Sequence, residues 1–266
     1  MASHLDKIVA YTREVVAARK AAADFALLER RAAAHTPRGF ARALRRTAAN
    51  GPAVIAELKK ASPSKGMIRE DLDVPVLAQQ LEAAGAAALS VLTEEKFFLG
   101  SLRNLERASA SVQIPCLRKD FMVDEFQMLE ARASGADAIL LIAASLTDGE
   151  LVALRNAARA MELDTLCEVH NREELQRVAD LGCDAYGVNA RNLNTFDVSL
   201  DVSLELLAML PPGAVRVAES GIHTSADLQR LRAAGYDAFL VGESLMRQPV
   251  PGDALKLLLA AETVKA

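Results

Sequence analysis

The chain has few of the residues on which several protein classes depend. It has no tryptophan, only 4% aromatic residues, three cysteines and four histidines among 266 residues. Nucleic-acid-binding surfaces usually combine a basic stripe with aromatic side chains, and this chain, with a formal net charge of −4, shows no such stripe. Its apolar runs are short compared with the roughly twenty residues that a membrane-spanning helix needs. We therefore expect neither nucleic acid nor a membrane among its partners.

The cysteines and histidines are too scattered for a disulfide framework or a metal site. Cys116, Cys167 and Cys183 are odd in number, form no C-x-x-C pair and lie in or near apolar runs. They are predicted to be reduced core residues of a cytoplasmic protein. The histidines show no metal-ligand spacing, so no metal and no cofactor is expected. Charges interrupt the first apolar stretch, so the amino terminus does not have the pattern of a signal peptide.

One pattern recurs along the chain and predicts its architecture. The segments "AAGAAALSVLT", "ASGADAILLIA", "DLGCDAYGVNA" and "AAGYDAFLVGE" each follow an amphipathic stretch and lead from a glycine into an apolar run. Gly85, Gly135, Gly182 and Gly235 fit the left-handed position that ends a helix. The apolar runs lack polar alternation, as parallel strands covered on both faces do. Each segment therefore predicts the junction between a helix and a buried parallel strand.

Eight such apolar runs are found, separated by helical patterns. They lie near Val54–Leu58, Leu89–Leu92, Ile114–Leu117, Ala138–Ile142, Leu166–Val169, Tyr186–Val188, Val215–Ala218 and Ala238–Val241. Eight strands alternating with helices predict an α/β protein with a (β/α)₈ TIM barrel. A doubly wound open sheet would use the same units, but no G-x-G-x-x-G follows the first run. We expect a single domain over residues 1–266.

Residues 1–50 are predicted to form a helical extension before the first strand. The stretch "HLDKIVAYTREVVAARKAAADFALLERRAA" has helical periodicity, with Ser3 as a candidate N-cap. The residues Thr36-Pro37-Arg38-Gly39 break the pattern, and "FARALRRTA" predicts a second short helix. Two placements remain open: a cap on the floor of the barrel, or a partial cover over its mouth.

Polar side chains follow the predicted strands at the end where barrel enzymes carry their active sites. Glu57 and Lys59 lie two residues apart, so they share one face of the first strand. Further charged and polar residues end later strands: Lys119, Glu168, Asn189, Arg191, Glu219, Ser220 and Glu243. A single buried Glu–Lys pair is more often a structural ion pair. Three carboxylates and two lysines at one mouth are costly to desolvate, and this favours a functional site.

The same pattern indicates which chemistry the lysines can perform. Carboxylates close to Lys59 and Lys119 favour protonated ammonium groups. A Schiff-base lysine must be neutral when it attacks, so we expect acids or anion clamps and not a class I aldolase. The loops at Ser220-Gly221 and at Gly242 fit the usual phosphate cradle of the barrel, although ordinary tight turns would look alike.

The residues together resemble the indole-3-glycerol phosphate synthase family. The segments "VIAELKKASPSKG", "SVLTEEKFFLGS", "PCLRKDFMVDEFQ", "GADAILLI", "LCEVHN", "YGVNARNL", "VAESGI" and "FLVGESLMR" carry the likeness, in the family's order along almost the whole chain. The resemblance implies ring closure of 1-(2-carboxyphenylamino)-1-deoxyribulose 5-phosphate, with loss of carbon dioxide and water, in tryptophan biosynthesis. It implies a carboxy-lyase that works by general acid and base catalysis.

The resemblance also implies roles for individual residues. Lys119 would protonate the ketone oxygen, and Glu168 and Lys59 would share the acid and base roles of dehydration in an undecided order. Lys59 would also hold the substrate carboxylate. Supporting roles go to Glu57, Asn189 and Glu219, and substrate or phosphate contacts to Ser62, Ser90, Phe98, Arg191, Ser220, Gly221, Gly242 and Glu243. Leu140 and Leu193 would extend the aryl wall of Phe98, unless they are simply core residues.

Two positions depart from the family pattern, and two rival functions remain. Ala61 stands where some members have a lysine near the phosphate, so that contact is expected to be either missing or supplied by Lys60. Glu243 replaces a serine, so its side chain is expected to point away from the phosphate. The rivals are a phosphoribosylanthranilate isomerase and a catalytically silent barrel that acts as a scaffold. The expected partner is a small phosphorylated substrate, and the expected state is a monomer, with a weak dimer as the alternative.

Overall fold

A computed structural model of the chain describes residues 4–192 and 195–260. Eight strands pair in the closed order β1-β10-β9-β8-β7-β6-β5-β4, and every pair is parallel. They are β1 (Ala53–Leu58), β4 (Ala88–Leu92), β5 (Cys116–Lys119), β6 (Ala138–Ile142), β7 (Asp164–Val169), β8 (Ala185–Asn189), β9 (Val215–Glu219) and β10 (Ala238–Val241). Because β1 pairs with both β4 and β10, the sheet has no open edge. The predicted (β/α)₈ barrel is confirmed.

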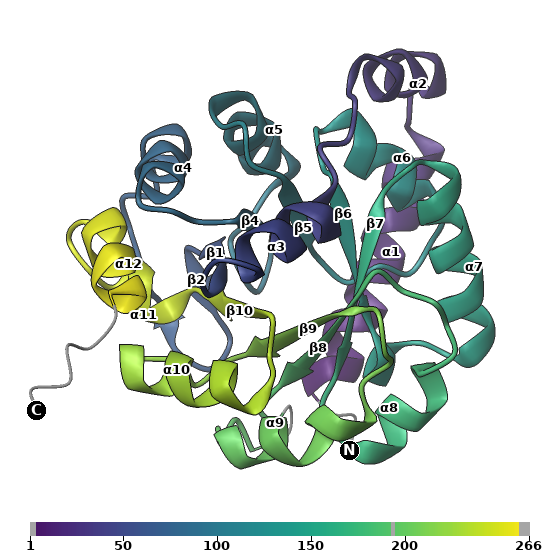
Figure 1. Ribbon diagram of the computed structural model, residues 1–266. Coiled ribbons are helices and arrows are strands. Elements are labelled where there is room, and N and C mark those ends of the chain that lie inside the picture. Colours follow the sequence, from purple (N-terminus) through teal and green to yellow (C-terminus); the bar gives the residue numbers. More distant parts are fainter. Residues whose placement is uncertain (1–3, 193–194, 261–266) are drawn as a thin grey trace, which may run out of the picture.

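Helices surround the strands as an outer ring (Figure 1). The ring contains α4 (Val74–Ala83), α5 (Leu102–Ser111), α6 (Phe126–Ala133), α7 (Asp148–Ala160), α8 (Arg172–Val178), α9 (Leu200–Leu206), α10 (Ser225–Ala234) and α12 (Pro251–Leu259). Short elements complete the loops: the hairpin β2 (Ala61–Ser62) and β3 (Gly66–Met67), the 3₁₀ turns η1 (Ala143–Ser145) and η2 (Leu207–Met209), and α11 (Glu243–Met246). The four glycines predicted to end helices all have positive φ, between 71° and 123°.

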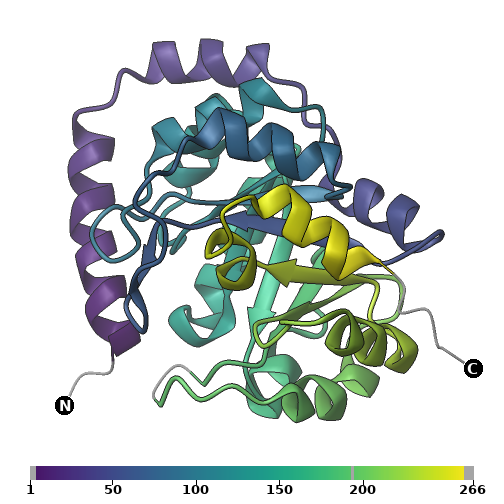
Figure 2. The same ribbon diagram turned by 90° about the vertical axis from the view of Figure 1, so that its left-hand side faces the viewer.

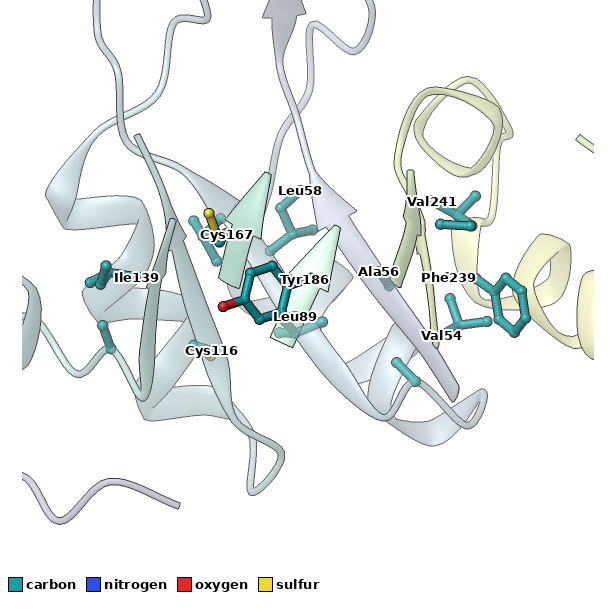
Figure 3. Packing of buried hydrophobic residues seen from close by; sticks show 14 of the residues in the cluster. Val54, Ala56, Leu58, Leu89, Cys116, Ile139, Cys167, Tyr186, Phe239 and Val241 are labelled. Carbon is teal, nitrogen blue, oxygen red and sulfur yellow. The ribbon is translucent and has the colours of Figure 1, made fainter. Parts of the chain in front are cut away.

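Alternate residues of each strand face the helices and the barrel interior. In β1, Val54, Ala56 and Leu58 belong to the core layer between strands and helices, part of which is shown in Figure 3. Ala53 and Ile55 belong instead to the core inside the barrel. A side chain two positions beyond Ile55 therefore also points inward. This alternation delivers the polar strand ends to one enclosed space.

The amino-terminal extension contains three helices, not the two that were predicted. The first periodic stretch breaks after residue 21, giving α1 (His4–Ala21) and α2 (Phe25–Ala34), and α3 (Phe40–Ala48) follows. Asp24 causes the break, because its side chain accepts a hydrogen bond from the Leu27 N–H (2.9 Å) and caps α2. The predicted N-cap Ser3 lies outside the described residues.

Different parts of the extension occupy the two placements left open by the sequence. Helix α3 crosses the near end of the barrel in Figure 1, and Phe40 and Leu44 pack there on the starts of the strands. Helix α1 runs along the side of the barrel in Figure 2, and its first residues reach the opposite end. The extension thus covers the floor with α3 and borders the mouth with α1.

A buried ion pair attaches the extension to the floor. Asp137, at the start of β6, is fully buried and accepts hydrogen bonds from the Arg38 backbone N–H (2.7 Å) and from Arg38 Nη2 (2.6 Å). The backbone N–H of Cys116 donates to the same carboxylate at 2.6 Å. Although burial works in the other direction, hydrogen bonds from His35 and Arg38 hold the pKa of Asp137 below its ordinary value.

Two smaller sequence predictions can be compared with the fold. The three cysteines are free and buried, as predicted. Strand β5 begins at Cys116 and not at Ile114, because Pro115 has no N–H to donate to a ladder and the Ile114 N–H donates to Glu82 (3.0 Å). Among the helices of the described residues, none combines the length and the hydropathy that crossing a bilayer requires.

Candidate active site

A cavity opens at the carboxyl ends of the strands and gathers most of the predicted site residues. Those that line it are Glu57, Lys59, Ser62, Phe98, Lys119, Glu168, Asn189, Arg191, Glu219, Ser220 and Glu243. His4, Leu5 and Ile8 of α1 close one side. Gly221 and Gly242 line an adjoining recess that also contains Lys59 and Ser220. Side chains far apart in the sequence meet here because the barrel strands bring their carboxyl ends, and the loops that follow them, to one mouth.

Lys119 lies at the centre of the charge cluster. Its Nζ is 2.5 Å from Glu168 Oε2 and 3.4 Å from Glu219 Oε2. Burial opposes the charged amine, but Glu168, Glu219 and Glu57 outweigh burial and raise the pKa of Lys119. Burial likewise opposes ionisation of Glu168, and Lys119 and His170 hold the pKa of that carboxyl well below its usual range. The pair therefore exists as ammonium and carboxylate, which suits proton donation and not Schiff-base formation.

Glu219 differs from its neighbours because it is held partly in the acid form. Burial raises its pKa to about 8; the Lys119 ammonium opposes this rise, whereas the nearby Glu168 carboxylate adds to it. Room for the side chain is provided by Gly187 in β8. A Cβ at residue 187 would lie 2.0 Å from Glu219 Oε1, so any larger residue there would displace the carboxyl group.

Glu57 holds Lys59 in place from the first strand. The two side chains form an ion pair, and Glu57 is buried while Lys59 is partly exposed to the cavity. Ser90 was predicted to contact substrate, but it is fully buried and does not line the cavity. Its hydroxyl donates to Glu57 Oε2 at 3.5 Å, so Ser90 supports Glu57 and does not form part of the wall.

A chain of hydrogen bonds joins the ends of the fifth, sixth and seventh barrel strands. Asn189 Nδ2 donates to Glu168 Oε1 (3.2 Å), and the Ser220 hydroxyl donates to Asn189 Oδ1 (2.8 Å). The Arg191 backbone N–H also donates to Asn189 Oδ1, at 3.1 Å. The asparagine is thereby fixed with its amide N–H toward the Glu168 carboxylate.

The loops after β9 and β10 form the recess where the fold usually binds phosphate. Ser220 and Gly221 have φ of 67° and 77°, and a Cβ on residue 221 would lie 2.8 Å from Val198. The Glu243 carboxylate is 3.1 Å from Arg247 Nε and 3.7 Å from Arg191 Nη2. Its charge is therefore paired within the protein, although the residue still borders the cavity.

An apolar wall faces the charged groups. Phe98 and Phe121 line the cavity with ring centroids 6.2 Å apart, and Leu140 lies on the barrel side of the same wall. Leu193, the other predicted wall residue, lies outside the described residues. Ser62 lines the cavity, whereas Lys60 and Lys65 are not among the described residues that line it. The phosphate contact proposed for Lys60 thus has no geometric support here.

The sequence analysis missed His170. Its ring is 7% exposed, with Nε2 3.2 Å from Glu168 Oε1 and Nδ1 3.1 Å from Glu174 Oε2. Although burial lowers it, these carboxylates raise the pKa of His170 to about 9. The spacing in the sequence could have indicated this residue. His170 follows Glu168 by two residues at a strand end, as Lys59 follows Glu57. The histidines were assessed only for metal-ligand spacing.

The part of the chain that the structure describes contains no evident set of metal ligands. No group of three or more histidine, cysteine, aspartate or glutamate side chains is arranged there to hold an ion. The fold and the cavity instead define a class: a (β/α)₈-barrel enzyme with acid, base and anion-binding side chains at its strand ends.

Comparisons with known proteins narrow this class to one family. The family model for indole-3-glycerol phosphate synthase matches residues 5–258. An indole-3-glycerol phosphate synthase from Koribacter versatilis is 60% identical over 259 residues, covering 97% of this chain and 100% of its own length. The protein of that name from Leptothrix cholodnii is 50% identical over 262 residues, with 98% and 100% coverage. The chain belongs to the indole-3-glycerol phosphate synthase family, whose members are carboxy-lyases of tryptophan biosynthesis.

Solved structures of lower identity share the fold alone. KGPDC from Streptococcus mutans matches with a TM-score of 0.60 at 15% identity, covering 79% of this chain and 96% of that chain. Thiamine phosphate pyrophosphorylase from Pyrococcus furiosus matches with a TM-score of 0.58, also at 15% identity, covering 78% and 93%.

Proposed function

We propose that the cavity catalyses the reaction of the family, the conversion of 1-(2-carboxyphenylamino)-1-deoxyribulose 5-phosphate to indole-3-glycerol phosphate. The single observation that carries this proposal is the contact of Lys119 with both Glu168 and Glu219 inside a cavity that also contains Lys59. The protein would act as a cytoplasmic monomer consisting of one domain, with residues 1–50 as its helical extension.

Ring closure requires an acid beside the ketone. The electron-rich anilino ring attacks the ketone carbon, and Lys119 donates a proton to the oxygen as the bond forms. Lys59, held by Glu57, binds the substrate carboxylate during the attack. Release of carbon dioxide then returns the bonding electrons to the ring.

Dehydration requires an acid and a base on the same intermediate. The hydroxyl departs as water with a proton, and a base removes a proton from the neighbouring ring carbon. Glu168 and Lys59 share these two roles, and Asn189 and Glu219 keep Glu168 and Lys119 in position. The five-membered ring becomes aromatic at this step.

The remaining residues hold the rest of the substrate. The recess at Ser220, Gly221 and Gly242, with Ser62 across the cavity, binds the phosphate through backbone N–H groups and hydroxyls. Phe98 supports the aryl group. Arg191 and Glu243 restrain the network and the recess by pairing with each other.

The test is incubation of the purified protein with the carboxyphenylamino substrate while indole fluorescence is followed. A rise in fluorescence that depends on protein concentration is expected. Isomerisation of phosphoribosylanthranilate without indole formation would favour the isomerase instead. No turnover of either substrate at high protein concentration would leave the silent barrel as the better interpretation.

A further inference from the structure

The proposed reaction takes up one proton from solvent in each turnover. Ring closure consumes one proton at the ketone oxygen, and dehydration consumes a second at the departing hydroxyl. Only one returns, from the ring carbon, because carbon dioxide leaves without a proton. An ionised substrate therefore reacts as carboxylate plus H⁺ to give product, carbon dioxide and water. The proton taken up from solvent must reach Lys119 and Glu168. Their side chains are only 13% and 4% exposed even before substrate covers them.

We propose that Glu168, His170 and Glu174 form a relay that delivers this proton to Lys119 from outside the substrate cavity. This inference rests on the proposed function. Starting at the cavity, Lys119 Nζ is 2.5 Å from Glu168 Oε2, and Glu168 Oε1 is 3.2 Å from His170 Nε2. His170 Nδ1 is then 3.1 Å from Glu174 Oε2. Four titratable groups thus lie in series.

The far end of the series opens into a different cavity. Glu168 lines the substrate cavity, whereas His170 and Glu174 line an outer one between the loops after β7 and β8. The other titratable groups around the outer cavity are Asp6 of α1 and Asp197. Among the described residues that line this cavity with His170, the other titratable side chains are all carboxyl groups. They favour a protonated imidazole and attract protons to this entrance.

Each transfer is followed by one rotation of the imidazole through 180°, which resets the relay. The imidazolium gives its Nε2 proton to Glu168, and Glu168 passes a proton to the Lys119 amine left after ring closure. The neutral imidazole keeps its other proton on Nδ1. The ring therefore turns to present this N–H to Glu168, and the bare nitrogen, now beside Glu174, takes up a proton from solvent through that carboxylate. Nε2 lies at ion-pair distance from Glu168 without hydrogen-bond alignment, so a small tilt of the ring completes the path. One proton enters, and every group returns to its starting state.

Hydrogen bonds in the first turn of α8 hold the Glu174 side chain in this position. Its Oε1 accepts from Asn171 Nδ2 (2.7 Å), and its backbone N–H donates to Asn171 Oδ1 (2.9 Å). The His170 backbone N–H donates to Glu174 Oε2 at 2.8 Å. The carboxylate is thereby held against the imidazole by the capping of α8.

The test measures kcat of the full-length chain for His170→Asn and Glu174→Gln at low buffer concentration and then with added imidazole. Both variants are expected to lose kcat, by about tenfold or more for His170→Asn, with KM changed less than about twofold. Added imidazole should restore several-fold of the lost rate, because a small buffer can carry the proton through the outer cavity. A purely structural defect would not respond to buffer.

Glu150→Gln is the matched control. Glu150 occupies the equivalent capping position of α7, where it binds Thr147 and lines neither cavity. Its kcat should equal that of the wild type at every buffer concentration. If His170→Asn does not fold, Glu174→Gln against Glu150→Gln decides the question.

Four outcomes would contradict the proposal at different points. A wild-type kcat in His170→Asn would overturn the relay, as would a loss that imidazole does not reverse. If kcat of Glu174→Gln equals that of Glu150→Gln at every buffer concentration, then neither Glu174 nor the outer cavity beside it is part of the proton path. A wild-type protein that forms no indole would instead overturn the proposed function on which the relay rests.

Discussion

At the scale of single residues, the proposed chemistry depends on one amine, that of Lys119, which its neighbours keep charged. Lys119 contacts carboxyl groups from two other strands, Glu168 and Glu219, and its raised pKa keeps it an ammonium throughout the neutral range. Removing its charge would leave Glu168 and Glu219 facing each other without a cation. Replacing Lys119 by a neutral residue therefore removes the proposed acid. It also changes the protonation of Glu168 and Glu219, which remain.

Lys119→Met is expected to lower kcat by a factor on the order of 10²–10⁴ with a modest change in KM, because methionine fills similar space without a proton to give. Steady-state kinetics of indole formation measure both constants. Lys256→Met, on the exposed face of α12, serves as the control and should match the wild type. A raised KM with an unchanged kcat would make Lys119 a binding residue.

At the scale of secondary-structure elements, the alternation of strand residues explains why many of the predicted site residues line one cavity. The rule that placed Glu57 and Lys59 on one inward face also applies to Glu168 and His170, and there it was not used. The rule gives direction but not depth. Ser90, predicted only as a substrate contact, is fully buried and is not among the residues that line the cavity. Depth depends on how the barrel staggers its strands, and this is set by pairings remote in the sequence.

Gly187→Ala is expected to reduce kcat/KM by about tenfold or more, because the new methyl group would displace the Glu219 carboxyl and disturb its contact with Lys119. The backbone at residue 187 is ordinary strand, so the effect should arise from the side-chain collision and not from backbone strain. Indole-forming kinetics and thermal unfolding would be measured together.

Gly149→Ala provides the control for this substitution. A Cβ at residue 149, in the first turn of α7, would meet no atom within 4 Å. It should leave activity unchanged and slightly favour the helix. Equal activity of the two alanine variants would show that Glu219 does not need the space beside Gly187.

At the scale of the whole molecule, the repeat of glycine and apolar run was enough to predict the barrel. The extension was harder, because its helices have similar composition and only their tertiary contacts separate them. Asp24 was a readable cap that the long periodic stretch concealed. The ion pair of Asp137 and Arg38, which attaches the extension to the floor of the barrel, could not be predicted. Nothing in the sequence relates two residues that are 99 positions apart.

Asp137→Asn is expected to lower the free energy of unfolding at pH 7 by about 3–5 kcal/mol, because it leaves the Arg38 charge without its buried partner. The folded-state pKa of Asp137 lies below its unfolded value, so its contribution is present above about pH 4 and is lost as the pH falls through the folded pKa. Urea unfolding at pH 7 and at lower pH should show the difference from wild type shrinking on acidification.

Asp253→Asn removes an exposed carboxylate that pairs with Lys256, and it should change stability by less than about 1 kcal/mol. If Asp137→Asn behaves like Asp253→Asn, then the buried contacts of Asp137 contribute little to holding the extension on the barrel.

The position of α1 has a practical consequence for handling the protein. His4, Leu5 and Ile8 line one side of the candidate active-site cavity. Any peptide fused ahead of them therefore begins beside that cavity. An affinity tag placed there would compete with the ligand for space. Helix α12 ends on the other side of the molecule in Figure 2, so purification handles for kinetic work belong on the carboxyl end.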